Sequence, residues 1–158
     1  METDIRWRII QAAKHELGVT ENPAGSNKQK FGEWFGFNGV EWCAIFCSWV
    51  YDQAGFPIGH PKFKTDFMKG FASVPFGMNI WKDHITKDPK MGDLVLFDWD
   101  KDKSPDHVGL FVEWMDKTAG LFYTIEGNTS AGNDSNGGQV QKRQRNLANV
   151  QCFINLIG

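Results

Sequence analysis

The hydrophobic period of this chain changes near Asp93, and that change limits the folds open to it. Before this point, apolar residues recur with the spacing of one face of an α-helix. After it, short alternating runs separated by turn-forming residues indicate β-strands. Helices followed by antiparallel strands are typical of an α+β fold, in which the helices pack on the sheet.

Two main helices are predicted before that point. The first covers residues 4–17, where apolar side chains recur at every fourth position and Gly18 can end the helix. The second covers residues 42–54, where the apolar positions follow the spacing of a buried helical face. Gly55 and Pro57 come shortly after it, and both residue types stop helices.

The remaining segments are predicted to be loops and strands. Residues 19–40 combine glycine and asparagine with aromatics, so we expect a structured loop with one short helix. A further short helix is predicted to begin at Thr65. Residues 128–138 are polar and rich in glycine, and we expect them to project from the sheet as a loop. The five strands of an antiparallel meander are predicted at residues 93–98, 107–114, 121–126, 139–143 and 150–157.

The size and charge of the chain exclude several classes of protein. With 158 residues the chain can bury a core of its own, and we expect one domain over residues 1–158. Lys and Arg number 17 and Asp and Glu number 19, so the net charge is −2. The basic residues form no stripe of the kind that binds the phosphates of nucleic acids. No apolar run approaches the ~20 residues of a membrane span, so we expect no membrane insertion. The first residues lack the pattern of a secretory signal peptide, which predicts synthesis in the cytoplasm.

The cysteines point to chemistry. They number 3 and cannot all pair, so at least one free thiol needs an explanation. Cys43 opens the second predicted helix, where unpaired amide groups and the helix dipole stabilise a thiolate. His107 begins a predicted strand and Glu126 ends another. A cysteine, a histidine and an orienting acid are the requirements of a cysteine hydrolase. Asn128 follows on the same face, and we expect it to contact the imidazole or the substrate.

Such a hydrolase also needs hydrogen-bond donors for the oxyanion of the intermediate. We expect the backbone N–H of Cys43 to be one donor, because it lies at the start of a helix. Asn38 is the candidate for a second donor. Trp42, next to the nucleophile, is expected to contact the substrate together with Asn38.

Each of these residues also has a simpler explanation. Cys43 and Cys47 share an apolar stripe, and free cysteines are often core residues. A lone histidine on a strand is often structural, and a glutamate at a strand end is usually solvated. A zinc site formed by Cys43, Cys47, His107 and Cys152 is a further alternative. Cys152, however, lies in an apolar run that suits the core.

One acidic segment resembles the start of a calcium-binding loop. Asp98, Asp100 and Asp102 alternate as in such a loop. Lys103 and the residues after it take the place of the expected glycine, so we interpret the segment as a solvated acidic turn. No metal and no cofactor are therefore expected.

Four segments that carry these residues resemble the CHAP family, the cysteine- and histidine-dependent amidohydrolases/peptidases of bacteriophage endolysins and bacterial autolysins. The resemblance covers about residues 5–157. The matching segments are Trp42-Cys43-Ala44, Met91-Gly92-Asp93-Leu94-Val95-Leu96-Phe97, His107-Val108-Gly109 and Glu126-Gly127-Asn128.

The resemblance implies a papain-like fold of the NlpC/CHAP type, with N-terminal helices packed on a five- to six-stranded antiparallel sheet. It implies Cys43 as the nucleophile, His107 as the base, Glu126 as the residue that orients the histidine, and Asn128 as a helper. Some relatives carry an aspartate-rich calcium site just before the nucleophile. Residues 19–41 contain no aspartate, so calcium dependence is not expected.

The implied substrate is bacterial peptidoglycan, cut at the N-acetylmuramoyl-L-alanine amide bond or within the stem peptide or cross-bridge. We expect a monomeric phage endolysin that is made in the host cytoplasm and acts on the cell wall after release. Two alternatives stay open. NlpC-type peptidases share the fold, although the Trp-Cys-Ala segment and Glu126 favour the CHAP family. A non-catalytic wall-binding or phage-structural domain on the same fold is the second alternative.

Overall fold

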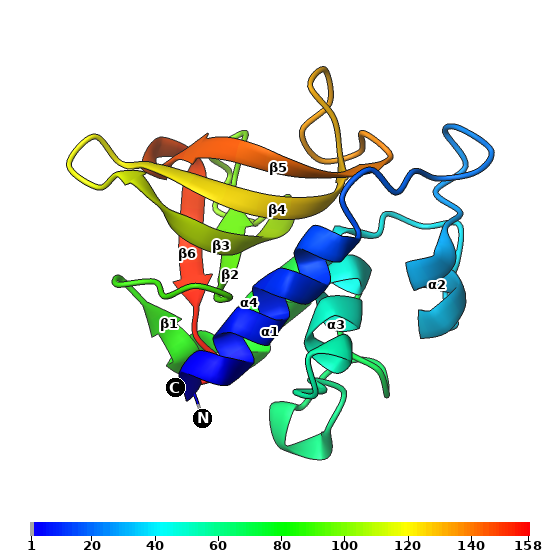
Figure 1. The fold of residues 1–158 in the computed structure, drawn as a ribbon, viewed down its shortest axis with the longest axis horizontal. Coiled ribbons are helices and arrows are strands. Elements are labelled where there is room, and N and C mark those ends of the chain that lie inside the picture. Colours follow the sequence, from blue (N-terminus) through cyan, green and yellow to red (C-terminus); the bar gives the residue numbers. More distant parts are fainter. Residues whose placement is uncertain (1) are drawn as a thin grey trace.

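Helices occupy the first half of the chain and most of the sheet comes from the second half (Figure 1). The computed structural model describes residues 2–158. Within these residues the α-helices are α1 (Glu2–His15), α2 (Lys30–Phe35), α3 (Cys43–Gln53) and α4 (Val74–Ile80). The strands are β1 (Ile85–Thr86), β2 (Leu94–Phe97), β3 (His107–Asp116), β4 (Leu121–Thr129), β5 (Gln139–Asn146) and β6 (Val150–Ile154). Short 3₁₀ helices lie at Pro61–Phe63, Lys82–His84 and Leu147–Asn149.

The strands form one antiparallel sheet in the order β1-β6-β2-β3-β4-β5. Strands β2 to β5 follow one another as neighbours, which confirms the predicted meander for this part of the sheet. β6 departs from the meander, because it crosses back to pair with β2, where Leu94 lies opposite Ile154. β1 extends the edge beside β6, and a strand of 2 residues is too short to show a period in the sequence.

The main core lies between the helices and one face of the sheet. α3 packs on β3 and β4, and α1 packs on α3 (Figure 1). Their contact side chains are fully buried, among them Ile9 and Ala13 of α1, Phe46 and Val50 of α3 and Leu110 of β3. Burial of one large apolar side chain contributes about 1.5–3 kcal/mol. This packing fixes α3 against the sheet, and with it the position of the first residue of α3.

The opposite face of the sheet carries a smaller, mainly aromatic cluster. Successive residues of a strand point to opposite faces, so β2 contributes alternately to the main core and to this cluster. The members of the cluster are Val95, Phe97, Phe111, Phe122 and Phe153. Phe97 and Phe122 stack in parallel with their ring centroids 6.5 Å apart. This cluster supports the end of β2 from which the next loop begins.

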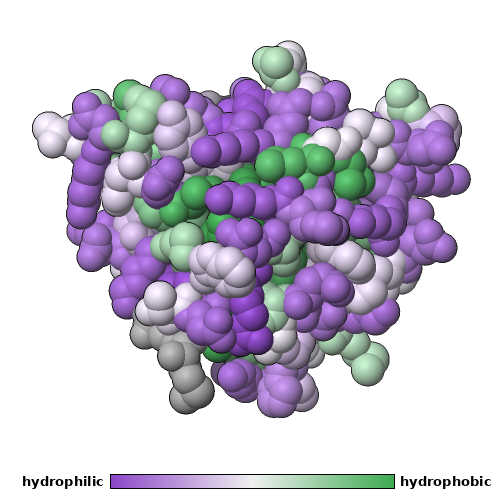
Figure 2. Space-filling view, viewed as in Figure 1, coloured by the Kyte–Doolittle hydropathy of each residue, from purple (hydrophilic) through white to green (hydrophobic). Residues whose placement is uncertain are grey.

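Hydrophilic side chains cover most of the face shown in Figure 2, with a band of hydrophobic residues across its middle. Most of the large apolar side chains are buried, and an exception such as Met68 is 93% exposed. None of the helices within residues 2–158 combines the length and the apolar composition that crossing a bilayer requires.

The two main predicted helices are confirmed to within about two residues at each end. The helix predicted to begin at Thr65 is wrong, because the Thr65 hydroxyl donates to the Phe67 carbonyl at 2.8 Å and Phe67 pairs with Gly70 as an isolated bridge. The helix of this region is α4 instead. Its N-cap is Ser73, whose hydroxyl accepts from a backbone N–H of the first turn, and Pro75 stands in that turn.

Candidate active site

Cys43 is the first residue of α3. Trp42 is the N-cap residue, and its side chain makes no capping hydrogen bond. The positive end of the helix dipole therefore lies at the Cys43 thiol. Cys43 is only 5% exposed, yet it lines a groove of about 630 Å³. The thiol is thus held by the core and still faces the groove.

The groove runs between three segments that are far apart in the sequence. One side is formed by Ser73 and Pro75 at the start of α4. The β2–β3 loop forms another side with Trp99, Asp100 and neighbouring residues. Ser135, from the loop between β4 and β5, completes the lining. The thiol therefore shares the groove with aromatic and carboxylate groups.

His107 is the first residue of β3 and is fully buried. Its Nε2 lies 2.8 Å from Oε1 of Glu126. Phe97 and Trp99 lie beside the imidazole, with ring centroids 5.9 and 6.2 Å from its own. The other ring nitrogen, Nδ1, is buried and has no hydrogen-bond partner among the described residues. A buried polar atom in this state calls for a functional explanation.

The pKa of His107 is raised from 6.5 to about 9. Burial acts in the opposite direction, because it disfavours the charged imidazolium and lowers the pKa. Interactions with Cys43 and with Glu126 outweigh that effect. The imidazolium is therefore the favoured form at neutral pH, and Cys43 lies close enough to the ring to contribute to this.

Glu126, on β4, is fully buried and ionised. Burial alone would raise its pKa, but hydrogen bonds and charges from Arg145 and His107 lower it from 4.5 to about 2. The hydroxyl of Thr124 also donates to Oε2 of this carboxylate. A carboxylate held in this way fixes the imidazole in one orientation and stabilises its charged form.

Arg145 of β5 belongs to the same network and was not predicted from the sequence. Its Nε donates to Oε2 of Glu126 at 2.8 Å and its Nη2 donates to Oε1 at 2.6 Å. Its Nη1 donates to Asp134 Oδ1 at 2.8 Å, and its guanidinium lies 5.0 Å from the ring centroid of Trp99. The available signal was indirect: a buried carboxylate needs a cationic partner, and arginine binds carboxylates in this two-pronged geometry.

Asn128 is buried near the end of β4 and has a left-handed backbone with φ 60°. Its Oδ1 accepts the backbone N–H of Gly138 at 3.0 Å, and its Nδ2 donates to Oδ1 of Asn136 at 3.1 Å. Its carbonyl accepts the N–H of Gly137 at 2.9 Å. These bonds direct the amide toward the β4–β5 loop, so Asn128 anchors the loop that carries Ser135 into the groove.

Asn38 and Trp42 lie outside the groove. Asn38 is exposed, and its Oδ1 accepts the backbone N–H groups of Gln29 at 3.2 Å and Gly39 at 3.1 Å. It lines a separate hollow beside α2. Trp42 is fully buried and donates from its indole nitrogen to Glu21 at 3.3 Å. The structure therefore gives Trp42 a packing role and presents neither side chain to a substrate beside Cys43.

The other cysteines are separate from this arrangement. Burial raises the pKa of the Cys47 thiol well above its ordinary value, and the charges of Cys43 and Glu126 add to the effect. Burial raises the pKa of Cys152 to about 11. Within residues 2–158, the one group of potential ligand atoms close enough to share an ion consists of aspartates. The zinc alternative thus has no support from the geometry.

A cysteine at a helix start, beside a histidine that is held by a buried carboxylate, is the arrangement of papain-like hydrolases on an α+β fold. A family model described as CHAP domain matches residues 35–128, which is more than half of the chain. The chain therefore belongs to the CHAP family, and it is a hydrolase of the amidase and peptidase kind that acts on peptidoglycan. The matched residues include Cys43, His107, Glu126 and Asn128. No curated protein matches the chain.

Proposed function

We propose that this protein is a cysteine-dependent peptidoglycan hydrolase that works through an acyl-enzyme. Cys43 is the nucleophile, His107 transfers protons and Glu126 orients the imidazole. The observation that carries the proposal is the state of the His107 ring. Nε2 is bound to Glu126, while Nδ1 is buried without a hydrogen-bond partner in the described part of the chain. Cys43 lies close enough to this ring to affect its pKa. Nδ1 is thus the nitrogen left for the thiol and the substrate.

In the first step, Sγ of Cys43 attacks the carbonyl carbon of the scissile amide, and a C–S bond forms. The carbonyl oxygen becomes an oxyanion, for which the backbone N–H of Cys43 at the start of α3 is the natural donor. Nδ1–H of His107 then gives its proton to the amide nitrogen, and the C–N bond breaks. The amine leaves, and the acyl group remains on Cys43 as a thioester.

In the second step, water attacks the thioester carbonyl. Nδ1 of His107, neutral after the first step, takes a proton from this water, and the C–S bond breaks. A carboxylic acid leaves, and Cys43 again faces an imidazolium. Glu126 keeps its hydrogen bond to Nε2 throughout, so the ring presents the same nitrogen to the groove in both steps.

We further propose that the enzyme acts as a phage endolysin that reaches the wall from the cytoplasm after the membrane has been opened. The cut bond is the N-acetylmuramoyl-L-alanine amide or a bond of the stem peptide or cross-bridge. The open, three-sided groove supports a branched polymer substrate, because a wall fragment can enter it sideways. To test the biological role, the protein is produced inside a susceptible bacterium. Lysis is expected only when a membrane-permeabilising agent is added, and lysis without that agent would contradict this part of the proposal.

The catalytic proposal is tested with Cys43→Ala on purified cell walls. We expect the rate of turbidity loss to fall by about 10⁴-fold, since removal of a catalytic nucleophile leaves only background catalysis. The matched control is Cys152→Ala, whose site lies on β6 away from the groove and which should keep the parent rate. Wall lysis by folded Cys43→Ala at the parent rate would refute the proposal. Loss of lysis with binding to walls retained separates catalysis from a purely adhesive role.

Product analysis identifies the bond. Mass spectrometry of fragments from defined peptidoglycan should show one class of new amino terminus. Termini at the alanine next to muramic acid identify an amidase, and termini inside the peptide identify an endopeptidase. Release of sugar fragments with intact peptide links would contradict amide hydrolysis altogether.

A further inference from the structure

The loop between β2 and β3 gathers four aspartates that the catalytic site does not use. They are Asp98, Asp100, Asp102 and Asp106. One carboxylate oxygen from each lies within 4.8 Å of the others. Four negative groups repel one another at this distance unless a cation lies between them.

Within the part of the chain that the structure describes, lysines and arginines do not balance this charge. Within residues 2–158, none of the four aspartates forms an ion pair with a lysine or arginine. The nearby Lys101 donates instead to the carbonyl of Ala148. The cluster therefore carries unfavourable repulsion.

Asp98 gives an independent sign of a ligand. The residue is only 6% exposed, so more than nine-tenths of it is buried. Its Oδ2 accepts the backbone N–H of Lys103 at 2.9 Å. Its Oδ1 is buried and has no hydrogen-bond partner in the described part of the chain. A buried carboxylate oxygen without a partner is costly, and a bound cation in the cluster would satisfy it.

The loop also follows the spacing of a known type of calcium loop. In the 12-residue EF-hand loop, ligands come from positions 1, 3, 5, 7, 9 and 12, and a glycine at position 6 makes a sharp turn. Counted from Asp98, the aspartates occupy positions 1, 3, 5 and 9, and Lys103 occupies position 6. Position 12 is Gly109, so the pattern extends only over the first nine positions here. Lys103 has φ 73°, the left-handed conformation that favours glycine, and its N–H bonds back to the first aspartate. The turn is therefore made although the glycine is missing.

We propose that Asp98, Asp100, Asp102 and Asp106 form a calcium site. An all-oxygen set of carboxylates on a loop suits Ca²⁺, which accepts flexible coordination by six to eight oxygens, better than Mg²⁺, which demands a small octahedron. This proposal differs from the interpretation of the segment as a solvated acidic turn. The sequence has three aspartates at alternate positions, and the structure adds that Asp106 converges with them.

The site would act on the groove wall. Trp99, Asp100, Ser104, Pro105 and Asp106 all line the groove. Asp106 directly precedes His107, and its Oδ2 accepts the backbone N–H of Trp99 at 2.8 Å. An ion among the aspartates holds the two ends of this loop together beside the histidine, so it should order the wall against which a substrate lies.

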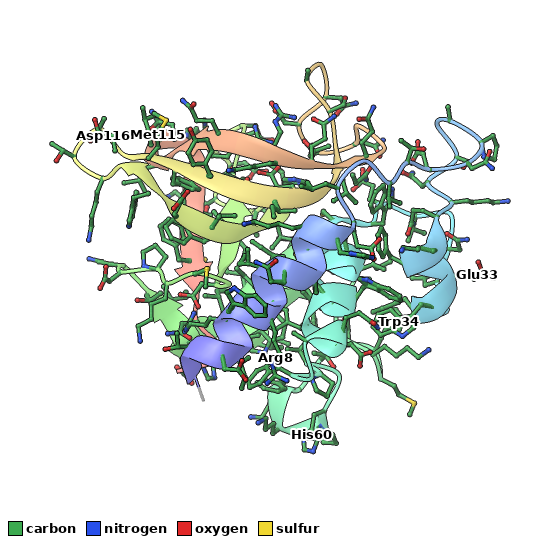
Figure 3. The ribbon with its side chains drawn as sticks, in the orientation of Figure 1. Arg8, Glu33, Trp34, His60, Met115 and Asp116 are labelled. Atoms are coloured by element: carbon green, nitrogen blue, oxygen red, sulfur yellow. The ribbon has the colours of Figure 1, made fainter. Side chains whose placement is uncertain are left out.

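The test uses the full chain after treatment with a chelator. Isothermal titration with CaCl₂ should give one ion per chain, with a Kd of about 10⁻³ M or tighter, and calcium should raise Tm. MgCl₂ should bind at least about tenfold more weakly. The double variant Asp100→Asn with Asp102→Asn should weaken calcium binding at least about tenfold and lose the Tm shift. The matched control is Asp116→Asn, at the far end of β3 in the β3–β4 hairpin (Figure 3), which should bind calcium like the parent.

Three results would overturn the proposal. The first is that calcium at about ten times that Kd gives neither heat nor a Tm shift. The second is that the double variant binds calcium as tightly as the parent. The third is that magnesium binds as tightly as calcium. Circular dichroism of the double variant shows whether it is folded. If it is not, Asp102→Asn alone is compared with Asp116→Asn in the same titration.

Discussion

At the scale of single residues, His107 has two nitrogens with different surroundings. Nε2 is bound to an ionised carboxylate, and Nδ1 has no hydrogen-bond partner among residues 2–158. The interactions with Cys43 and Glu126 raise the pKa of this histidine to about 9 although it is buried. The proton that the leaving amine requires is therefore available at Nδ1 across neutral pH.

This predicts the pH profile of the enzyme. The proposed mechanism needs the imidazolium, so kcat/KM should fall as pH rises through about 9. Glu126→Gln removes the negative charge that helps to raise the pKa of His107. The basic limb of the profile should then move to lower pH by about one unit or more, toward the ordinary value of about 6.5. The check is to measure wall lysis by both proteins from about pH 6 to about pH 10, a range that includes both pKa values of the histidine.

Glu113→Gln is the matched control for this experiment. Glu113 lies on β3 like the histidine, but its side chain is exposed. Its removal should leave the profile unchanged. A basic limb that stays in place in Glu126→Gln would mean that the carboxylate does not set the proton affinity of His107.

Arg145 gives a second prediction at this scale. Arg145→Met leaves the buried charge of Glu126 without its strongest partner, so the free energy of unfolding should fall by about 3 kcal/mol at pH 7. The folded-state pKa of Glu126 is about 2, below its ordinary 4.5. The stabilisation that the parent gains from Arg145 is therefore fully present above about pH 4.5, and it disappears as pH falls toward 2. The difference between parent and variant in urea unfolding should shrink over the same window.

Arg143→Met serves as the control for Arg145→Met. Arg143 lies two residues earlier on β5 and bonds to Thr129, Ser130 and Asp134, but it does not contact the catalytic carboxylate. Its loss should cost about 1 kcal/mol and show no such pH window. Equal losses in the two variants would assign Arg145 a role in loop packing alone.

At the scale of elements, the sequence predicted most of the fold because helices and strands each have their own apolar period. Long periodic segments such as α1, α3 and β3 were found for this reason. The two-residue β1 and the return of β6 to β2 depend on tertiary pairing, which no local period encodes. The order of Cys43, His107 and Glu126 could be read from the sequence, but Arg145 could not. Its role depends on which residues β5 places next to β4, and its neighbours in the sequence are polar or charged like those of any exposed strand.

The contact between β3 and β4 explains why a glycine follows the histidine by two residues. A Cβ at Gly109 would lie 2.5 Å from Cγ of Glu126. Gly109→Ala should therefore push the carboxylate away from His107 and cost about 1–3 kcal/mol of stability. Lysis should fall more than stability alone explains, and the NMR titration of His107 should move to lower pH. Gly132→Ala, where an added Cβ meets nothing within 4 Å, should change neither quantity.

At the scale of the whole molecule, one buried arginine joins the two ends of the chain. Nη1 of Arg6 donates to Oδ1 of Asp93 at 2.8 Å and to the carbonyl of Met91 at 2.9 Å. Nη2 donates to Oδ1 of Asn155 at 2.9 Å and to the carbonyl of Gly158 at 3.0 Å. One side chain of α1 thus links the turn before β2 with the segment after β6, and no local pattern in the sequence reveals such a link.

Loss of this link should affect stability rather than chemistry. Arg6→Met leaves the fully buried Asp93 without its guanidinium partner, so the free energy of unfolding should fall by about 3–5 kcal/mol. Arg8→Met is the matched control on the same helix (Figure 3), because the Arg8 pair with Asp4 is exposed and worth less than about 0.5 kcal/mol. None of the partners of Arg6 named above lines the groove, so Arg6→Met should keep the parent rate of lysis well below its Tm. Urea unfolding measures the first effect and turbidity loss at low temperature the second. A folded Arg6→Met with a much lower rate would show that the ends of the chain also control the geometry at Cys43.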